Sequence, residues 1–254
     1  SIGLDPNGVV YVAYYDATNT NPKWAKMIDG EWTTQTLFSD PDSDVGRYVS
    51  LAVDGFGRVF IVFQDVAEQQ IRFMYYSGSS WIESGYMDAV YSGEASVAMG
   101  PEGEVHVSYF DLSWQDLRYA TNDIWIRESL YSLGNVQGDC DAAFDRSGVL
   151  NVCYVQKDSA DLYYAKNLNG VWTPEALATG DGVHATNPSI AMDSRGFAHI
   201  CFYENIGSDL WYTTNIGGTW TTWKYTTGLA GAYPSIALDG NDKAHICFQV
   251  NPDH

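Results

Sequence analysis

One pattern of apolar and polar positions recurs six times along this chain of 254 residues. Each copy begins with a segment in which small residues alternate with large apolar ones, as in SLAVD from Ser50 and SIAMD from Ser189. A short polar turn follows, and then a run that is apolar on both of its alternating faces, as in VHVSYF from Val105. A period of two predicts β-strands, and apolar residues on both faces predict a strand that is covered on both sides. The copies begin at residues 1, 50, 96, 141, 189 and 235.

The first two strands of each copy are joined by a turn with its own signature. The turns read DPNG, DGFG, GPEG, DRSG, DSRG and DGND. Asp in the first place and Gly in the fourth are typical of a type I turn, in which the Asp side chain accepts backbone N–H groups. The first five copies continue with two more short segments, one of the type LRYAT or LYYAK and one that starts at a Trp. Each complete copy therefore predicts four strands, which we call A to D in chain order.

Four short strands in 45 to 49 residues match the size of one β-propeller blade. We therefore expect an all-β fold and a single β-propeller domain over residues 1–254, with five complete four-stranded blades and a two-stranded partial sixth. The small residues of strand A indicate that A is the innermost strand, where blades converge. A ring of six blade positions is favoured. A ring of five, with the last two strands docked elsewhere, is the alternative.

The partial sixth unit leaves an apolar strand without an outer neighbour. Strand B of this unit, residues 243–250, would be an open edge, and proteins rarely leave such an edge bare. We expect this edge to meet a segment upstream of Ser1 in a longer parent chain or a neighbouring molecule, which includes another copy of the protein itself.

The repeats resemble those of uncharacterised, secreted bacterial propellers, which carry S-I-A-L-D, H-I-x-F/Y and L-x-Y-A segments. Here they include SIALD from Ser235 and LYYA from Leu162. The turn over residues 213–220 is also similar to the Asp-box of sialidase-type propellers, with Asn215 in place of the usual Asp. Asp-boxes are structural in that family, so the likeness implies a fold and no catalytic residue. The plan is further similar to six-bladed fucose-binding lectins, although their pocket pattern of Arg, Glu and Trp does not recur at one register here.

Charge narrows the class of partner. Thirteen Lys and Arg residues stand against 32 Asp and Glu residues, which gives a net charge of −19. A field of this sign repels nucleic acid and anionic membranes, so we expect neither as a partner. No apolar run reaches the roughly 18 residues that cross a membrane, so no membrane insertion is expected. The acidic balance and the resemblance to secreted propellers lead us to expect an extracellular or cell-surface protein.

Cysteine positions follow the repeat. One place in strand B holds Cys in three successive units: Cys153, Cys201 and Cys247. The other units have Ala, Val or Ser there, which indicates a small packing position. If Asp145 and Gly148 flank the A–B turn, Cys140 lies opposite Cys153. A cross-strand disulfide is then open to this pair, unless a bulge or the local geometry prevents it.

Two further repeated positions hold side chains that bind cations in other proteins. The first Asp of the A–B turn recurs as Asp5, Asp54, Asp145, Asp193 and Asp239. Turn capping is the favoured interpretation, and a ring of carboxylates that binds Ca²⁺ is the alternative. One strand B position holds His106, His199 and His245, with aromatic residues or Asn elsewhere. Aromatic substitution predicts packing with one polar contact, and separate blades argue against a shared metal site. No cofactor is certain, and Ca²⁺ is the ion that the acidic residues suit.

Candidate ligand-binding residues lie in the B–C loops and in the connectors from D to the next A. By strand alternation these segments share one face, opposite the A–B and C–D turns. We expect them to be longer than the turns and to vary between units, and function concentrates on such loops. Carboxylates with exposed aromatic rings suit sugar hydroxyls and sugar faces, and a solvated acidic rim is the alternative. The candidates are Asp16, Arg47, Tyr48, Asp65, Asp111, Trp114, Asp116, Asp161, His184, Glu204, Asp209 and Tyr233.

The sequence leaves three functions open. The first is a non-catalytic, lectin-like propeller that recognises a glycan or a protein, because near-identical blades supply equivalent weak sites and avidity. The second is a glycoside hydrolase or lyase on the same face, which needs two carboxylates about 5–9 Å apart. The third is a scaffold that assembles with copies of itself through strand 243–250. The chain has no G-x-S-x-G, H-E-x-x-H, P-loop or dinucleotide motif. We favour binding over catalysis, because an enzyme commonly breaks the symmetry of its repeat at one deep pocket.

Overall fold

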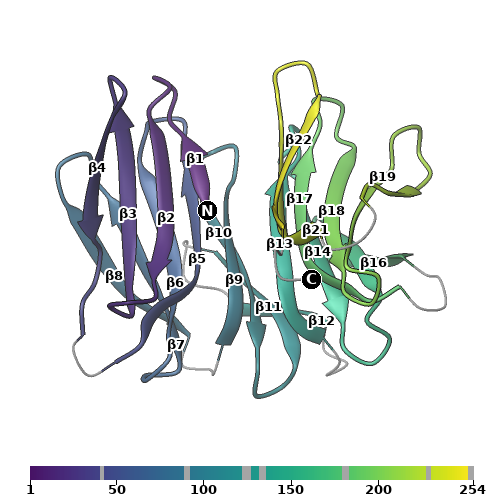
Figure 1. Ribbon diagram of the computed structural model, residues 1–254, viewed down its shortest axis with the longest axis horizontal. Coiled ribbons are helices and arrows are strands. Elements are labelled where there is room, and N and C mark those ends of the chain that lie inside the picture. Colours follow the sequence, from purple (N-terminus) through teal and green to yellow (C-terminus); the bar gives the residue numbers. More distant parts are fainter. Residues whose placement is uncertain are drawn as a thin grey trace. The chain divides into compact units, whose positions relative to one another are not determined.

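The computed structural model describes residues 1–40, 43–88, 92–121, 127–131, 136–178, 183–226 and 230–250. Every regular element in these ranges is a β-strand (Figure 1), so they contain no helix that could span a membrane. The strands form five four-stranded antiparallel sheets and one two-stranded sheet. Hydrogen-bonded neighbours follow chain order in each sheet, so each four-stranded sheet is one blade with strands A to D, and the two-stranded sheet has strands A and B. The expected five complete blades and one partial blade are confirmed.

The chain divides into two compact units, residues 1–129 and 130–254. The first unit contains blades 1 to 3, whose last strand extends two residues into the second unit. Blade 1 consists of β1 (Ile2–Leu4), β2 (Val10–Asp16), β3 (Asn21–Ile28) and β4 (Glu31–Thr36). Blade 2 consists of β5 (Val45–Val53), β6 (Val59–Asp65), β7 (Gln70–Tyr76) and β8 (Trp81–Asp88). Blade 3 consists of β9 (Ser92–Met99), β10 (Val105–Asp111), β11 (Asp116–Thr121) and β12 (Arg127–Tyr131).

The second unit contains blades 4, 5 and 6. Blade 4 consists of β13 (Val136–Phe144), β14 (Leu150–Gln156), β15 (Leu162–Leu168) and β16 (Val171–Ala178). Blade 5 consists of β17 (Ala185–Met192), β18 (Ala198–Glu204), β19 (Asp209–Thr214) and β20 (Thr221–Lys224). Blade 6 consists of β21 (Ala230–Leu238) and β22 (Ala244–Val250). The expected single ring, with six positions or five, stays a prediction.

The hydrophobic cores lie between neighbouring blades. In the first unit, Tyr11 and Trp24 of blade 1 pack with Leu51 and Ile61 of blade 2, and blades 2 and 3 share a second cluster. In the second unit, one cluster joins blades 4 and 5 and another joins blades 5 and 6. Strand B of blades 2 and 5 therefore packs on both faces, which explains why apolar residues occupy both of its alternating faces.

Strand A is where neighbouring blades of one unit meet most closely, as expected from its small residues. A Ser that begins a copy of the repeat accepts a backbone N–H from strand A of the next blade. Leu51 donates to Ser1 Oγ at 3.1 Å, and Ile236 donates to Ser189 Oγ at 3.3 Å. In blade 4 the position holds Asp141, whose Oδ2 accepts the equivalent backbone N–H of blade 5 at 3.0 Å, so the position keeps a short side chain with an oxygen acceptor.

The A–B turn has a loop of three residues with a bulge. In blade 4, Gly148 N donates to Asp145 O, as in a type I turn, and Asp145 N donates to Val149 O. Gly148 has a φ of 76°, which favours glycine. The extra residue sets the register, so Cys153 pairs with Asp141 and Cys140 lies opposite Tyr154. The predicted pairing of Cys140 with Cys153 assumed a shorter loop and is wrong, and none of the four cysteines forms a disulfide bond.

The B–C loops are uniform rather than variable, which corrects the expectation from sequence. Each has four residues between its paired ends, and the fourth has a φ between 54° and 56°. These left-handed residues are Thr20, Gln69, Gln115, Ala160 and Ser208. The D–A connectors lie partly outside the described residues. The five B–C loops thus share a left-handed residue at the same place, while their side chains differ.

Candidate functional site

The five turn aspartates cap their own turns. In each, Oδ1 accepts the N–H groups of the residues two and four positions later, at 2.8–3.1 Å. Burial works against ionisation of Asp193, but the N–H groups of Phe197 and Arg195 and the Arg195 guanidinium hold its pKa below the ordinary value. No three His, Cys, Asp or Glu side chains gather as a metal site would need within the described ranges. The capping interpretation accounts for these carboxylates.

Two of the strand B histidines make the expected polar contact, in both cases with a tyrosine of strand C. His199 Nδ1 lies 2.5 Å from Tyr212 Oη on strand C, and His106 is hydrogen-bonded in the same way to Tyr119. The other ring nitrogen of His199 faces Asp193 at 3.8 Å. Burial lowers the pKa of His199, so the imidazole is neutral near pH 7.

The carboxylates at the end of strand B close the B–C loops. Asp65 Oδ1 accepts the N–H of Glu68 at 3.2 Å, and its Oδ2 accepts from Arg72 Nε at 2.7 Å. The same pairing joins Asp16 with Lys23 and Asp111 with Arg118, while Glu204 accepts the backbone N–H groups of Ile206 and Gly207 in its loop. The Lys23 ammonium lowers the pKa of Asp16. These four predicted ligand-binding residues already have partners inside the fold.

The predicted acids at the start of strand C are also held by the fold. Asp209 is buried and forms an ion pair with Lys224 on β20. Asp116 is buried beside Asp111, its partner in the β10–β11 pairing. Asp161 is half-buried, and its N–H donates to Ser159 Oγ at 3.3 Å.

The remaining five candidates are four residues with aromatic rings and one arginine, and their side chains are exposed to solvent. Arg47 and Tyr48 lie together on a β-bulge of β5, where Arg47 pairs with Asp44 at 2.7 Å. Trp114 and Tyr233 are 67% and 70% exposed, and His184 is exposed. Tyr48 and Tyr233 occupy equivalent bulges with φ values of 52° and 50°. These residues stay predicted contacts, and none of the twelve candidates lines the cavity that we describe next.

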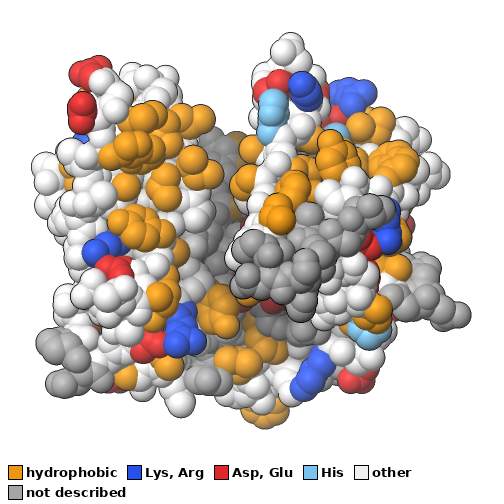
Figure 2. Space-filling view, in the orientation of Figure 1, with side chains coloured by type: hydrophobic (Ala, Val, Ile, Leu, Met, Phe, Trp, Pro, Cys, Tyr) orange, Lys and Arg blue, Asp and Glu red, His pale blue; other side chains and the backbone are white. Residues whose placement is uncertain are grey.

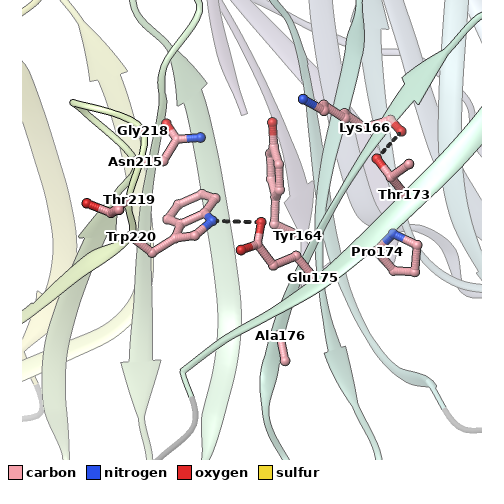
Figure 3. A pocket seen from close by; sticks show the side chains of 10 residues that line it. All are labelled: Tyr164, Lys166, Thr173, Pro174, Glu175, Ala176, Asn215, Gly218, Thr219 and Trp220. Carbon is pink, nitrogen blue, oxygen red and sulfur yellow. Dashed lines mark hydrogen bonds between the residues drawn. The ribbon is translucent and has the colours of Figure 1, made fainter.

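A cavity of about 710 Å³ lies between the outer strands of blades 4 and 5 (Figure 3). Strands β15 and β16 of blade 4 form one side, and the turn between β19 and β20 of blade 5 forms the other. It is lined by Tyr164, Lys166, Thr173, Pro174, Glu175, Ala176, Asn215, Gly218, Thr219 and Trp220. Sequence analysis placed ligand contacts on the opposite loops and missed all ten.

Trp220 of blade 5 and Glu175 of blade 4 are hydrogen-bonded to each other across the gap between the blades. Trp220 Nε1 donates to Glu175 Oε2 at 3.0 Å, although the residues are 45 positions apart. The Trp220 ring meets Tyr164 edge-on, with centroids 5.0 Å apart. The hydrogen bond fixes the indole plane and uses one carboxylate oxygen. Figure 3 shows both side chains at the centre of the cavity.

Tyr164 forms the inner wall and is itself rigid. Its hydroxyl donates to Asn151 Oδ1 at 2.5 Å, and Asn151 Nδ2 donates to Val149 O at 2.7 Å. Burial raises the pKa of Tyr164 to about 12, and the negative charges of Asp145 and Glu175 act in the same direction. The phenol therefore stays protonated across the physiological range.

Lys166 and Asn215 bring polar nitrogen atoms to the rim. Asn215 Oδ1 accepts the N–H of Ala198 at 2.7 Å, so its oxygen is held by the fold. Figure 3 shows the amide nitrogen turned toward Tyr164 and the Lys166 ammonium above the cavity. The cavity thus combines an indole face, a carboxylate, an ammonium and an amide. Such a set can pack against an apolar patch of a ligand and hydrogen-bond to hydroxyl groups.

The comparisons with known proteins give structural neighbours only. No family model matches the chain, and no curated protein matches it. A lectin from Aleuria aurantia in complex with α-methyl-L-fucoside superposes with a TM-score of 0.68 and 14% identity, over 98% of this chain and 86% of the lectin. A protein of unknown function from Dyadobacter fermentans gives a TM-score of 0.72 and 12% identity, over 99% and 89%. The fold is a β-propeller.

A third neighbour is an enzyme. The leech intramolecular trans-sialidase gives a TM-score of 0.67 and 10% identity, over 98% of this chain and 64% of the enzyme. This chain therefore spans slightly less than two thirds of that enzyme. At such identities the propeller fold is shared, while the type of repeat and the function need their own evidence.

Proposed function

We propose that this protein is a non-catalytic carbohydrate-binding propeller and that the cavity between blades 4 and 5 is a saccharide site. One observation carries the proposal: the Trp220 indole is clamped by Glu175 in an open cavity that Lys166 and Asn215 also line. A preformed ring loses little conformational entropy when a ligand packs on it. We retain the expectation of an extracellular or cell-surface protein as part of this proposal.

Each lining group has a distinct task in this site. The indole of Trp220 packs against the C–H face of a sugar ring. Glu175 accepts a hydrogen bond from one hydroxyl, and the nitrogen atoms of Lys166 and Asn215 donate to others. Because these groups come from two blades, the site requires the two sheets to keep their spacing. Charge-assisted hydrogen bonds from Glu175 and Lys166 provide most of the discrimination between sugars.

Binding is favoured over hydrolysis by the number of acids in the lining. Glycoside hydrolysis commonly uses a pair of carboxyl groups on either side of the scissile bond. Glu175 is the one carboxylate among the lining residues. The lectin that shares the fold holds a fucoside, and the leech enzyme was prepared with 3′-sialyllactose. These two saccharides are therefore the first probes to use.

A glycan array followed by calorimetric titration tests the proposal. The array identifies a ligand, starting from α-methyl-L-fucoside and 3′-sialyllactose, and calorimetry gives its affinity for the unaltered protein. Trp220→Ala should weaken binding at least about tenfold, or roughly 1.4 kcal/mol. Glu175→Gln preserves the shape of the side chain and should weaken binding by several fold through loss of its charge.

Trp114→Ala is the matched control, because Trp114 is an exposed indole on the predicted loop face. It should leave the affinity unchanged. If Trp114→Ala abolishes binding and Trp220→Ala does not, the saccharide binds to the B–C loops and the proposed site is wrong. Release of a shortened saccharide during prolonged incubation would contradict the non-catalytic assignment.

A further inference from the structure

The outer edge of β22 lacks the neighbour that every other strand B has. Strands β2, β6, β10, β14 and β18 each pair with a strand C on this side. In contrast, β22 pairs with β21 and with no other strand among the described residues. The pairing of strand B with strand C, which β22 lacks among the described residues, therefore occurs five times in the same molecule.

One face of β22 is covered and the other is exposed. Ala244, Ile246 and Phe248 pack against the core between blades 5 and 6. His245 and Cys247 between them are exposed, whereas their counterparts in β18, His199 and Cys201, are buried. Figure 2 shows hydrophobic side chains along the exposed surface of β22.

The sequence of β22 lacks the residues that commonly block pairing at a sheet edge. It reads AHICFQV and contains no Lys, Arg, Asp, Glu or Pro. Native proteins commonly place such residues on edge strands that must stay unpaired. An uncharged, seven-residue strand with free backbone groups along one side is suited to pairing.

The repeat itself shows which chemistry covers this edge. In blade 5 the contacts run from Tyr212 on strand C to His199 and on to Asp193. Blade 6 repeats two members, because His245 Nε2 lies 3.2 Å from Asp239 Oδ2. The tyrosine position belongs to strand C, which the described part of blade 6 does not include. In β11, β15 and β19 that tyrosine follows a fully buried leucine by two residues: Leu117, Leu162 and Leu210.

We propose that the outer edge of β22 binds an antiparallel β-strand with the Leu-x-Tyr pattern of strand C, supplied by a partner polypeptide. Backbone hydrogen bonds would provide affinity by β-augmentation, and the tyrosine hydroxyl would meet His245 Nδ1. The leucine would lie opposite Gln249, as Leu210 lies opposite Tyr203 of β18. This surface is separate from the saccharide cavity, so either proposal can fail without the other.

A peptide with the sequence of residues 209–226 is the probe, since it carries strands C and D of blade 5. It is labelled with fluorescein and titrated into the chain of residues 1–254, and binding is followed by anisotropy. Hydrogen exchange then locates the contact. We expect saturable binding and at least about tenfold slower exchange of the amides of β22, because paired strand amides are protected from solvent.

A double-mutant cycle tests the tyrosine–histidine contact. In the peptide, Tyr212→Phe should weaken binding to the unaltered protein by about 2- to 10-fold, which corresponds to one net hydrogen bond. The same change should have no effect on the His245→Phe protein. Phenylalanine is a suitable replacement because Phe60 occupies this position in blade 2.

Three results would overturn the proposal. One is the absence of saturable binding, or binding equalled by a peptide of scrambled sequence. Another is protection of other strands while β22 stays unprotected. The third comes from light scattering and exchange on the free protein: a dimer whose β22 amides are already slow and are not released by the peptide would make a second copy the occupant.

Discussion

The outer gaps between blades 1 and 2 and between blades 4 and 5 are built from the same strand positions, but side chains fill only the first. Trp24 meets Trp81 edge-on in the first gap, with centroids 5.1 Å apart. Tyr164 meets Trp220 edge-on in the second, at 5.0 Å. The aromatic frame is therefore shared, and the difference must come from the residues around it.

One position accounts for most of the difference. Tyr76 ends strand C of blade 2 and contacts both Trp24 and Trp81, at centroid distances of 5.1 and 5.4 Å. The equivalent residue in blade 5 is Asn215, whose short side chain turns to Ala198. A ring thus fills the first gap, whereas the second keeps a cavity of about 710 Å³.

The polar residue opposite the strand C aromatic ring also has a different hydrogen-bond partner in the two gaps. Gln35 accepts a hydrogen bond from Trp24 Nε1 of its own blade, at 3.4 Å. Glu175 at the equivalent position accepts from Trp220 of the next blade, at 3.0 Å. The comparison shows that the candidate site differs from the filled gap at three positions, where Tyr164, Glu175 and Asn215 replace a Trp, a Gln and a Tyr.

The largest expected effect is on the stability of the filled gap. Trp24 is 5% exposed and has aromatic neighbours on several sides, so Trp24→Ala should lower the free energy of unfolding by about 3–5 kcal/mol. Trp220→Ala should cost only about 1–2 kcal/mol, because that ring is partly exposed at an open cavity. Urea unfolding followed by circular dichroism measures both. Equal losses would show that the two gaps do not differ as described.

Exchanging the residue at the end of strand C should close the open gap and open the filled one. Asn215→Tyr should fill the cavity and weaken saccharide binding at least about tenfold. Tyr76→Asn should open the first gap and destabilise the protein by about 1–3 kcal/mol. Calorimetry and urea unfolding give the two values. Unchanged binding in Asn215→Tyr would mean that the cavity is not the saccharide site.

A smaller effect is the pH dependence of stability, which should differ between strand B of blade 5 and strand B of blade 2. Burial lowers the pKa of His199 below its ordinary value near 6.5, although Asp193 opposes this shift. The unfolded chain therefore takes up a proton first as the pH falls, and stability is lost below about pH 6.5. Blade 2 has Phe60 at this position, so His199→Phe should reduce the loss. Thermal unfolding midpoints at pH 7.5 and 5.0 measure it, and an identical fall in both proteins would contradict the assignment.

The smallest effect involves one lysine beside each gap. Lys26 lies over the Tyr76 ring at 5.7 Å, so Lys26→Ala should cost about 0.5–1 kcal/mol of stability. Lys166 has Asn215 in place of that ring, so Lys166→Ala should change stability by less than about 0.5 kcal/mol and weaken saccharide binding by several fold. Urea unfolding and calorimetry distinguish the two roles. A stability loss in Lys166→Ala that matches Lys26→Ala would remove the distinction.

The repeat predicts the blades well because it depends on local chemistry. Alternation in strand A, the apolar strand B and the Asp of each A–B turn all act within one hairpin, and the structure confirms them. The error at Cys140 arose from a single turn residue. The bulge at Gly148 adds one position to the loop, and a shift of one residue changes every cross-strand partner.

The cavity was missed because it depends on residues one repeat apart. Glu175 and Trp220 come together only when two sheets pack, and the search for a recurring Arg, Glu and Trp pattern assumed that equivalent blades would have equivalent sites. The end of strand C gave no such signal. Asn215 has the residue type that Asn122 and Asn167 hold in blades 3 and 4, and Tyr76 of blade 2 is a departure from the repeat.

The indole N–H resonances provide the most direct test that the open gap is the saccharide site. A ¹H–¹⁵N spectrum observes Trp220 Nε1–H in the open gap, Trp24 Nε1–H in the filled gap and Trp114 Nε1–H on the loop face, with assignments from Trp→Phe variants. On titration with the glycan identified by the array, the Trp220 signal should shift in a saturable manner while those of Trp24 and Trp114 stay in place. A shift of the Trp114 signal with Trp220 unmoved would contradict the account.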